Sequence, residues 1–349
     1  MHRLLVSSQL VDRDWLLLEV LADEPVVVAQ GHALRKFVPT SVFLRRNPHL
    51  ASILTAVAET VGDKRSVTKH VGHANTVIRT RSVVSNDGRV HGVHLWVGPA
   101  TARPAPRSLP GAVSWDLTTG TASDTPQALF NAGLDLSVEK TDGRTFAADM
   151  PIGHINRDEA QVLALSMSCK PGDTFCSTWD ATGYDGERIR VSFVARAALE
   201  SNADGTDHLV ARAMNWRVAH KEPPEPDGDL ARQIVKDLAQ EGIHRAFVDL
   251  RTWNLLKWLD PPFPHADWRG EVVGQPFVHP DDHPVLRAMT QQFVDGPAVG
   301  LLRLRAIGGG WTLVHSTVHR VHLLDDNFAG LISIRLPTPA ELLRKSHAL

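Results

Sequence analysis

The chain has little cysteine and almost no tyrosine: Cys169 and Cys176 are its 2 cysteines, and there is 1 tyrosine in 349 residues. Two thiols cannot build the disulfide framework of a small secreted domain, and they cannot supply four thiolate ligands to a zinc ion. We therefore expect two reduced, structural thiols. A regulatory disulfide between Cys169 and Cys176 stays open as an alternative.

The sequence also lacks long apolar runs and an excess of charge of either sign. No run approaches the ~20 apolar residues that span a bilayer, and the start of the chain lacks the apolar core and cleavage site of a signal peptide. The formal net charge is -2, which gives no basic footprint for nucleic acid or for an anionic membrane. These absences predict a cytoplasmic protein with no membrane insertion and no nucleic-acid partner.

What is present is the composition of a globular protein, with 43% hydrophobic and 22% charged residues. The length exceeds that of one typical domain, and two proline-rich segments, 99–110 and 220–229, divide the chain. We read both segments as linkers. They predict an N-terminal domain at 1–98, a middle domain at 111–219, a C-terminal domain at 230–337 and a short helix at 338–349.

The first block carries signals for a helix. Asn47 is a good N-cap, Pro48 suits the first helical position, and Gly62 follows the last residue of an apolar stripe. Upstream, the runs Trp15–Leu21 and Pro25–Val28 fit either a strand pair or a helix end followed by a strand.

A hairpin follows that helix. Asn75–Val84 and Val90–Val97 are rich in β-branched residues, and Ser85-Asn86-Asp87-Gly88 joins them. An Asp-Gly pair between two such runs predicts a tight turn between antiparallel strands.

The later blocks repeat these signals. Helices are expected after Asn156 or Asp158, over Val285–Val294, and after a capping box at Thr338-Pro339-Ala340-Glu341. Strands are expected at Ala112–Leu117, Thr174–Thr182, Glu187–Leu199, His208–Val218, Arg245–Leu250, Val299–Ala306, Trp311–Leu324 and Gly330–Leu336.

Turn, helix and strand signals thus follow one order in three blocks. Polar turns stand before the last strand of each block, at Ser85–Gly88, Ser201–Gly205 and Asp325–Asn327. Because turns need Asn, Asp and Gly anyway, the alternative is two domains with coincidental turns. We predict an α+β chain of three tandem domains, each an antiparallel sheet with helices packed on it.

The third block resembles a PAS sensor domain over about residues 229–336. The resemblance rests on Val278-His279-Pro280-Asp281-Asp282 before a helix, on Arg303-Leu304-Arg305, on Gly309-Gly310-Trp311, and on the closing strand Gly330–Ile334. In that family the acidic turn leads into a helix packed on a five-stranded antiparallel sheet. The middle block is similar to PAS or to the related GAF fold. The whole chain resembles the actinobacterial triple-sensor proteins arranged PAS–GAF–PAS, which lack an output domain.

No motif for catalysis or for a metal site assembles. His315 and His319 share one strand face but are about 13 Å apart, too far for one ion. Asp281 and Asp282 are interpreted as a helix start rather than a catalytic carboxylate pair. Neither cysteine stands in a flavin-photosensor motif, so no cofactor is predicted, and haem and flavin stay open.

A ligand pocket is expected in the third block. Trp253, Phe277, Val278 and Trp311 lie near its predicted sheet and are candidates to line a small apolar pocket. The amphipathic helix expected at Leu230–Gln240 packs either on its own domain or on a second copy, giving a homodimer.

The sequence therefore predicts a non-enzymatic sensory or adaptor protein of signal transduction. It would bind a small molecule, another signalling protein, or both, through its PAS/GAF-like domains. The alternatives are a protein-interaction scaffold whose pockets are filled by its own side chains, and an enzyme with an unrecognised active site.

Overall fold

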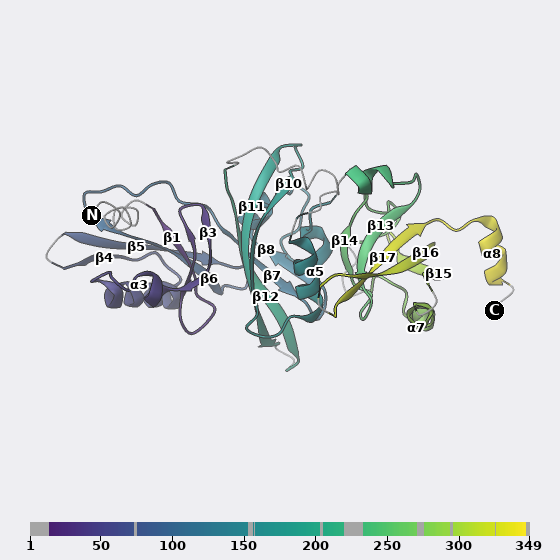
Figure 1. Cartoon of the computed structure of the whole chain (residues 1–349), viewed down its shortest axis with the longest axis horizontal. Coiled ribbons are helices and arrows are strands. Elements are labelled where there is room, and N and C mark those ends of the chain that lie inside the picture. The colour runs from purple at the N-terminus through teal and green to yellow at the C-terminus, as the bar shows by residue number, and fades with distance from the viewer. Residues whose placement is uncertain are drawn as a thin grey trace. The chain divides into compact units, whose positions relative to one another are not determined.

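The computed structural model describes residues 14–72, 75–152, 156, 158–202, 205–219, 233–270, 276–293, 296–324 and 326–346. Its strands form three antiparallel sheets (Figure 1). The contacts within the chain divide it into two compact units. Unit 1 is Met1–Asp116, Ser123–Thr141 and Lys170–Glu222, and unit 2 is Leu117–Ala122, Asp142–Cys169 and Pro223–Leu349.

The first sheet belongs to unit 1 and has the order β3-β2-β1-β6-β5-β4. Helix α3 covers one of its faces, where Ile53 and Val57 share a core with Leu18 and Val93 (Figure 1). The elements of this part are β1 (Leu16–Glu19), β2 (Val26–Gln30), β3 (Ala33–Pro39), α2 (Thr40–Phe43), α3 (Leu50–Asp63), β4 (Thr68–Val71), β5 (Thr76–Val84) and β6 (Val90–Pro99).

The expected hairpin and strands are present, and the helix is shifted. The runs that fitted two alternatives form the strand pair β1–β2. The predicted cap Asn47 instead closes a turn, because its Oδ1 accepts from the His49 backbone N–H at 2.9 Å, and α3 begins at Leu50. Gly62 lies inside the helix, which ends where Lys64 takes the left-handed conformation at φ 55°. The prediction of a helix from Asn47 to Gly62 was wrong at both ends.

The predicted linker 99–110 lies against the other face of the first sheet. Trp15 donates from Nε1 to the Ala105 carbonyl at 3.0 Å, and Trp15 and Trp96 pack with Ala100 and Ala102. The proline-rich composition therefore marks a strap held on the sheet.

The second sheet has the order β10-β11-β12-β7-β8-β9. Within unit 1 its Met214 and Trp216 share a core with Leu17 and Val28 of the first sheet. Its elements are β7 (Gly111–Asp116), β8 (Thr121–Asp124), α4 (Pro126–Asn131), β9 (Arg144–Thr145), β10 (Thr174–Thr182), β11 (Arg188–Ser201) and β12 (Asp207–Arg217). Helix α4 was not predicted; Thr125 caps it, because its hydroxyl accepts the Ala128 N–H at 3.3 Å.

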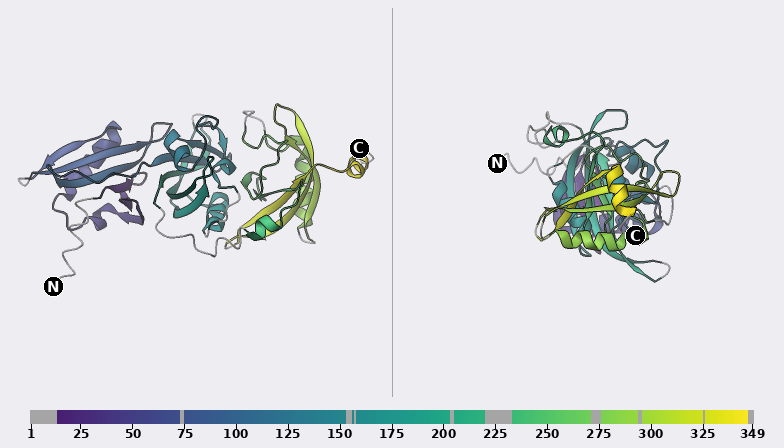
Figure 2. Two further views of the ribbon diagram at one scale, coloured as in Figure 1. Left: turned by 90° about the horizontal axis from the view of Figure 1, so that it is seen from above. Right: turned by 90° about the vertical axis from the view of Figure 1, so that its right-hand side faces the viewer.

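Unit 2 holds the third sheet, in the order β14-β13-β17-β16-β15. Figure 2 shows β15, β16 and β17 arching together, with α7 along one side. The elements are η1 (Phe146–Asp149), α5 (Glu159–Ser168), β13 (His244–Asp249), β14 (Leu255–Trp258), η2 (Pro280–Asp282), α7 (His283–Gln292), β15 (Ala298–Arg305), β16 (Trp311–His322), β17 (Phe328–Arg335) and α8 (Pro339–Ser346). The predicted three-strand meander is confirmed, and β14 was not foreseen.

The acidic turn Asp281–Asp282 was predicted to start α7, and its hydrogen bonds differ from those of a helix cap. Asp282 precedes α7, but the structure shows no side-chain cap there. Its carboxylate instead accepts from the backbone N–H of Arg303 at 2.6 Å and from the Arg303 guanidinium at 2.6 Å. The turn therefore ties the start of α7 to β15.

One buried ion pair attaches α5 to the third sheet inside unit 2. Lys257 on β14 has no exposed side-chain surface, and its Nζ lies 2.7 Å from Glu159 Oε1 on α5. Burial lowers the pKa of Lys257, and the Glu159 carboxylate opposes that shift.

In the described part of the chain, no helix is long and apolar enough to cross a bilayer.

Candidate functional site

Unit 2 contains a cavity of about 430 Å³, open to solvent, beside one end of the third sheet. This volume lies within the range of pockets that hold small molecules. The ends of α5 and β13, the last turn of α7 and the β16–β17 hairpin form its walls. The lining residues are Met167, Ser168, Asp249, Leu250, Arg251, Thr290, Phe293, Arg320, Asp326, Asn327 and Phe328.

Asp249 shapes the wall that follows β13. Its carboxylate accepts from the Arg251 N–H at 2.8 Å and from the Thr252 hydroxyl at 3.0 Å, and its carbonyl accepts from the Trp253 N–H at 2.7 Å. These bonds fix a tight turn in which Trp253 has φ 60°. The carboxylate is therefore occupied in holding the backbone.

Two arginines bring positive charge to the cavity. The Arg251 guanidinium donates to the Met167 carbonyl at 2.6 Å, which joins the end of α5 to the turn after β13. The Arg320 guanidinium lies over the Phe328 ring, 3.5 Å from its centroid. A guanidinium stacked on a ring keeps its outward N–H groups available to a ligand.

The cavity thus joins apolar surface to a few polar groups. Leu250, Phe293 and Phe328 supply the apolar part, and Arg320 and Asn327 supply hydrogen-bonding groups. The Ser168 hydroxyl, at the end of α5, donates to the Ala164 carbonyl at 2.9 Å. Among its described lining residues there is no histidine and no cysteine.

The four residues predicted to line a pocket are placed elsewhere in unit 2. Trp253, Phe277 and Val278 pack, partly buried, against the main core of this unit. The Trp311 ring contacts the His279 ring at a centroid distance of 4.5 Å. None of the four lines the cavity described above. A pocket formed by these four stays a prediction.

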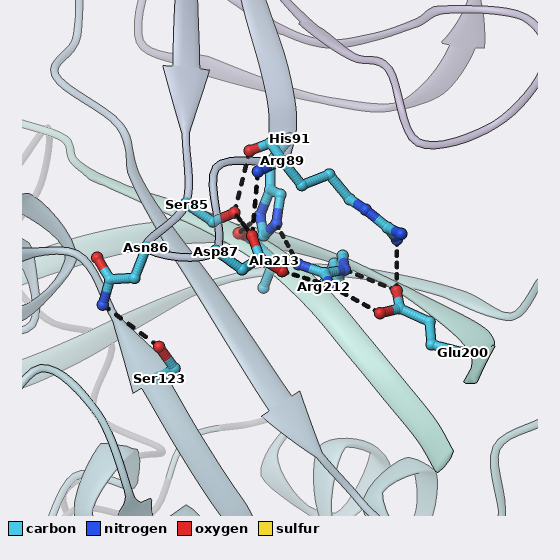
Figure 3. A network of polar contacts seen from close by, with 9 residues as sticks. All are labelled: Ser85, Asn86, Asp87, Arg89, His91, Ser123, Glu200, Arg212 and Ala213. Carbon is cyan, nitrogen blue, oxygen red and sulfur yellow. Dashed lines mark hydrogen bonds and ion pairs between the residues drawn. The ribbon is translucent and has the colours of Figure 1, made fainter. Parts of the chain in front are cut away.

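A second polar cluster lies within unit 1, where the first two sheets meet (Figure 3). Arg212 on β12 is 2.7 Å from both Glu200 carboxylate oxygens, 2.7 Å from Asp87 Oδ2 and 3.1 Å from His91 Nε2. Arg89 reaches the same Glu200 at 2.6 Å. The β5–β6 hairpin is thereby bound to β11 and β12.

Burial sets the protonation of His91. The side chain is fully buried, and burial lowers its pKa to about 4, with a smaller lowering from Arg212 and an opposing effect of its bond to Ala213. Because a guanidinium only donates, His91 Nε2 accepts from Arg212, and Nδ1–H donates to the Ala213 carbonyl at 3.0 Å. For Asp87, burial opposes ionisation, but hydrogen bonds from Ser85 and Arg212 hold its pKa well below the usual range.

The described residues contain neither a cluster of metal ligands nor a disulfide. No group of three or more His, Cys, Asp or Glu side chains in that part of the chain is arranged to hold a metal ion. In the part of the chain that the structure describes, neither Cys169 nor Cys176 is in a disulfide, and each is partly buried. His315 lies 3.3 Å from Glu341 of α8, so it serves a local contact.

Three family models match the chain in succession and divide it into three domains. Residues 14–106, 109–218 and 228–345 match the Rv3651-like N-terminal, middle and C-terminal domains. An uncharacterized protein from Mycobacterium tuberculosis of known structure is 49% identical, with 95% of this chain and 99% of that chain covered and a TM-score of 0.87.

Other solved structures are much less similar. A sensory box histidine kinase/response regulator from Burkholderia thailandensis is 18% identical over 37% of this chain and 89% of its own, with a TM-score of 0.23. A TM-score of this size carries no argument about fold or function. The search of the curated proteins found no match. The domain matches and the mycobacterial structure show that the chain belongs to the Rv3651-like family, with its N-terminal, middle and C-terminal domains in tandem.

Proposed function

We propose that this protein is a cytoplasmic, non-enzymatic sensor or adaptor of signal transduction, and that its C-terminal domain binds a small molecule in the unit 2 cavity. The observation that carries the proposal is the cavity of about 430 Å³, with a stacked Arg320–Phe328 pair and apolar walls. A pocket of this kind orients a ligand through few polar groups.

A PAS-like identity of the third domain supports the same proposal. The five-stranded antiparallel sheet, with α7 after the acidic turn packed against it, is the arrangement that the resemblance to PAS sensor domains implies. The middle domain is proposed to be of PAS or GAF type.

The cavity also offers a physical route for a signal within unit 2. Its wall includes Met167 at the end of α5, which Arg251 holds by one hydrogen bond. A ligand that competes for Arg251 would change how the end of α5 is held. The response can be no larger than the difference in ligand affinity between the two arrangements.

Freshly purified full-length protein tests the proposal by native mass spectrometry together with an absorbance spectrum. The proposal predicts an added mass that disappears on denaturation, or a haem or flavin band. A ligand-free mass, unchanged by incubation with a small-molecule library, would overturn it. Turnover of a library compound would instead make the protein an enzyme.

One observation favours a scaffold as the second candidate. Ile234 and Leu238, on the described part of the helix expected at Leu230–Gln240, are 49% and 62% exposed. Exposed apolar side chains on one helix are typical of a surface covered by a partner or by a second copy. Light scattering of wild-type protein and of the double variant Ile234→Glu, Leu238→Glu tests this: a dimer that the variant abolishes supports it, and a wild-type monomer that captures no partner contradicts it.

A further inference from the structure

Arg320 stands on the core-facing side of β16, at the end of the strand that reaches the unit 2 cavity. Ser316 and Val318 precede it on the same face, because side chains alternate along a strand, and both are fully buried. The residue directly opposite Arg320 on β17 is Gly330, and a Cβ placed there would lie 2.7 Å from Leu250 Cδ2. Arg320 and Leu250 therefore belong to the same side of the sheet, and both line the cavity.

The guanidinium of Arg320 differs from the guanidinium groups that hold unit 2 together. Arg245, for example, pairs with Asp260 at 2.8 Å. Arg320 lies instead over the Phe328 ring, and among the described residues no carboxylate forms an ion pair with it. Its side chain is exposed, so a ligand that enters the cavity from solvent can reach it.

The second cation of the lining, Arg251, is already engaged. Its guanidinium lies 3.6 Å from the Asp249 carboxylate and donates to the Met167 carbonyl at 2.6 Å. The remaining acidic group of the lining is Asp326, which is exposed on the β16–β17 turn, where water and salt screen its charge. Arg320 is thus the cation of the cavity whose charge no side-chain ion pair offsets.

We propose that the ligand of the unit 2 cavity is a compact carboxylic acid, bound as its anion with the carboxylate on Arg320 and the apolar part against Leu250 and Phe293. This inference rests on the proposed function, because it specifies the class of small molecule that the cavity binds. A guanidinium donates two parallel N–H bonds to a carboxylate. The single charge of a carboxylate is matched by one arginine, whereas a phosphate dianion would keep an unmatched charge.

A comparison of acids with their primary amides tests the proposal, because the two have nearly the same shape and differ in charge. Full-length protein is titrated by calorimetry at pH 7 with benzoate, phenylacetate and hexanoate, each beside its amide. The expected result is that at least one acid binds, and that it binds about tenfold or more tightly than its amide. Tenfold corresponds to about 1.4 kcal/mol, near the lower end for a hydrogen bond to a charged group.

Three variants connect that preference to the cavity. Arg320→Gln is expected to lower the preference for acid over amide by about tenfold, with little effect on amide binding. Arg287→Gln makes the same change of charge at an exposed arginine of α7 that does not line the cavity, and it should keep the preference. Asp326→Asn removes a like charge and should strengthen the binding of acids at low salt, while amides bind as before.

The outcomes separate this inference from the proposed function. Amides that bind as tightly as acids, a small-molecule library that yields neutral ligands alone, or a loss in Arg320→Gln that is equal for acids and amides would overturn the carboxylate and leave a ligand-binding cavity. Acid binding that persists in a cavity-filling Thr290→Trp variant would also overturn it, because the acid would then bind elsewhere. If neither the acids, the amides nor the library bind, both the inference and the proposed function fail.

Discussion

At the scale of residues, unit 1 compensates the buried charge of Arg212 in a network of hydrogen bonds and ion pairs. Arg212 is held between Glu200 and Asp87, and His91 stays neutral because its Nε2 accepts from that same arginine. The contact between the first and second sheets therefore depends on the protonation states of Glu200, Asp87 and His91. Removing one partner of such a network lowers the stability of the fold strongly, because the remaining charged group is left buried and unpaired.

The stability of unit 1 should depend on pH through His91. Its pKa is about 4 in the folded chain against an ordinary value of 6.5, so between these values the unfolded chain binds more protons. Stability is fully present above about pH 6.5 and falls as the pH drops toward 4, by about 3 kcal/mol in all. Urea unfolding of wild type and His91→Gln measures this: the variant should lose less stability over that range. Parallel pH curves would contradict it.

Residue roles of this kind were only partly visible in the sequence. His91 and His94 lie on opposite faces of β6, as the two-residue period of a strand requires: His91 contacts Ala213, and His94 contacts Ser108. Nothing local to His91 points to Arg212, which is more than a hundred residues away in the chain. Partners so distant depend on how sheets pack, which a periodicity does not encode.

At the scale of elements, turn chemistry located most strands, and packing decided the rest. The Asp-Gly hairpin and the meander β15-β16-β17 were predicted because each strand stands between strong turn signals. Helix α4 has only 6 residues in a polar segment, and its start is visible only as Thr125-Pro126. The short strand β14 was missed because its four residues are buried on both faces and show no alternation.

Substitutions of Lys257 on β14 and Glu159 on α5 should have strongly non-additive effects on stability. Lys257→Met leaves Glu159 buried without its cation and should lower the stability of unit 2 by ~3 kcal/mol. The double variant Lys257→Met, Glu159→Leu should recover most of that loss, because it buries no charge at all. Thermal unfolding of the two single variants and the double variant measures this coupling, and additive effects would disprove it.

Helix α8 should depend on Glu341. The Glu341 carboxylate accepts from the Arg335 guanidinium at 2.8 Å and from the Thr338 N–H at 2.7 Å. The second bond is the glutamate half of the predicted capping box, while the Glu341 N–H donates to the Thr338 backbone carbonyl. These bonds, first that from Arg335, hold its pKa below the usual range. In Glu341→Gln the amide hydrogens of α8 should exchange faster, while those of β17 keep their protection. The neighbouring Leu343→Gln, 63% exposed, is the control, and equal protection in both variants would count against the account.

At the scale of the whole molecule, the family domains and the compact units do not coincide. The middle domain matches residues 109–218, yet Asp142–Cys169 belongs to unit 2 by its contacts. Ala147 lies in the same core as Val248 and Trp258 of the C-terminal domain. The order of three tandem domains could be predicted from repeated turn signals. The interleaved packing could not, since it depends on contacts between segments about 100 residues apart.

A fragment of residues 228–349 should therefore be less stable than unit 2 within the full chain. It lacks Ala147 from its core and Glu159 beside Lys257. Hydrogen exchange should show weaker protection of β13 and β14 in the fragment, and adding a peptide of residues 142–169 should restore part of it. Equal protection in fragment and full chain would show that the C-terminal domain is complete by itself.

The central claim is that the unit 2 cavity holds a small molecule, and native mass spectrometry of a cavity-filling variant tests it most directly. Thr290 lines the cavity from α7, and the next residue, the exposed Gln291, does not. Wild-type protein and Gln291→Trp are predicted to retain the same non-covalent added mass, from the cell or from a small-molecule library, and Thr290→Trp to lose it. An added mass retained by Thr290→Trp, or none in any of the three proteins, would contradict the claim.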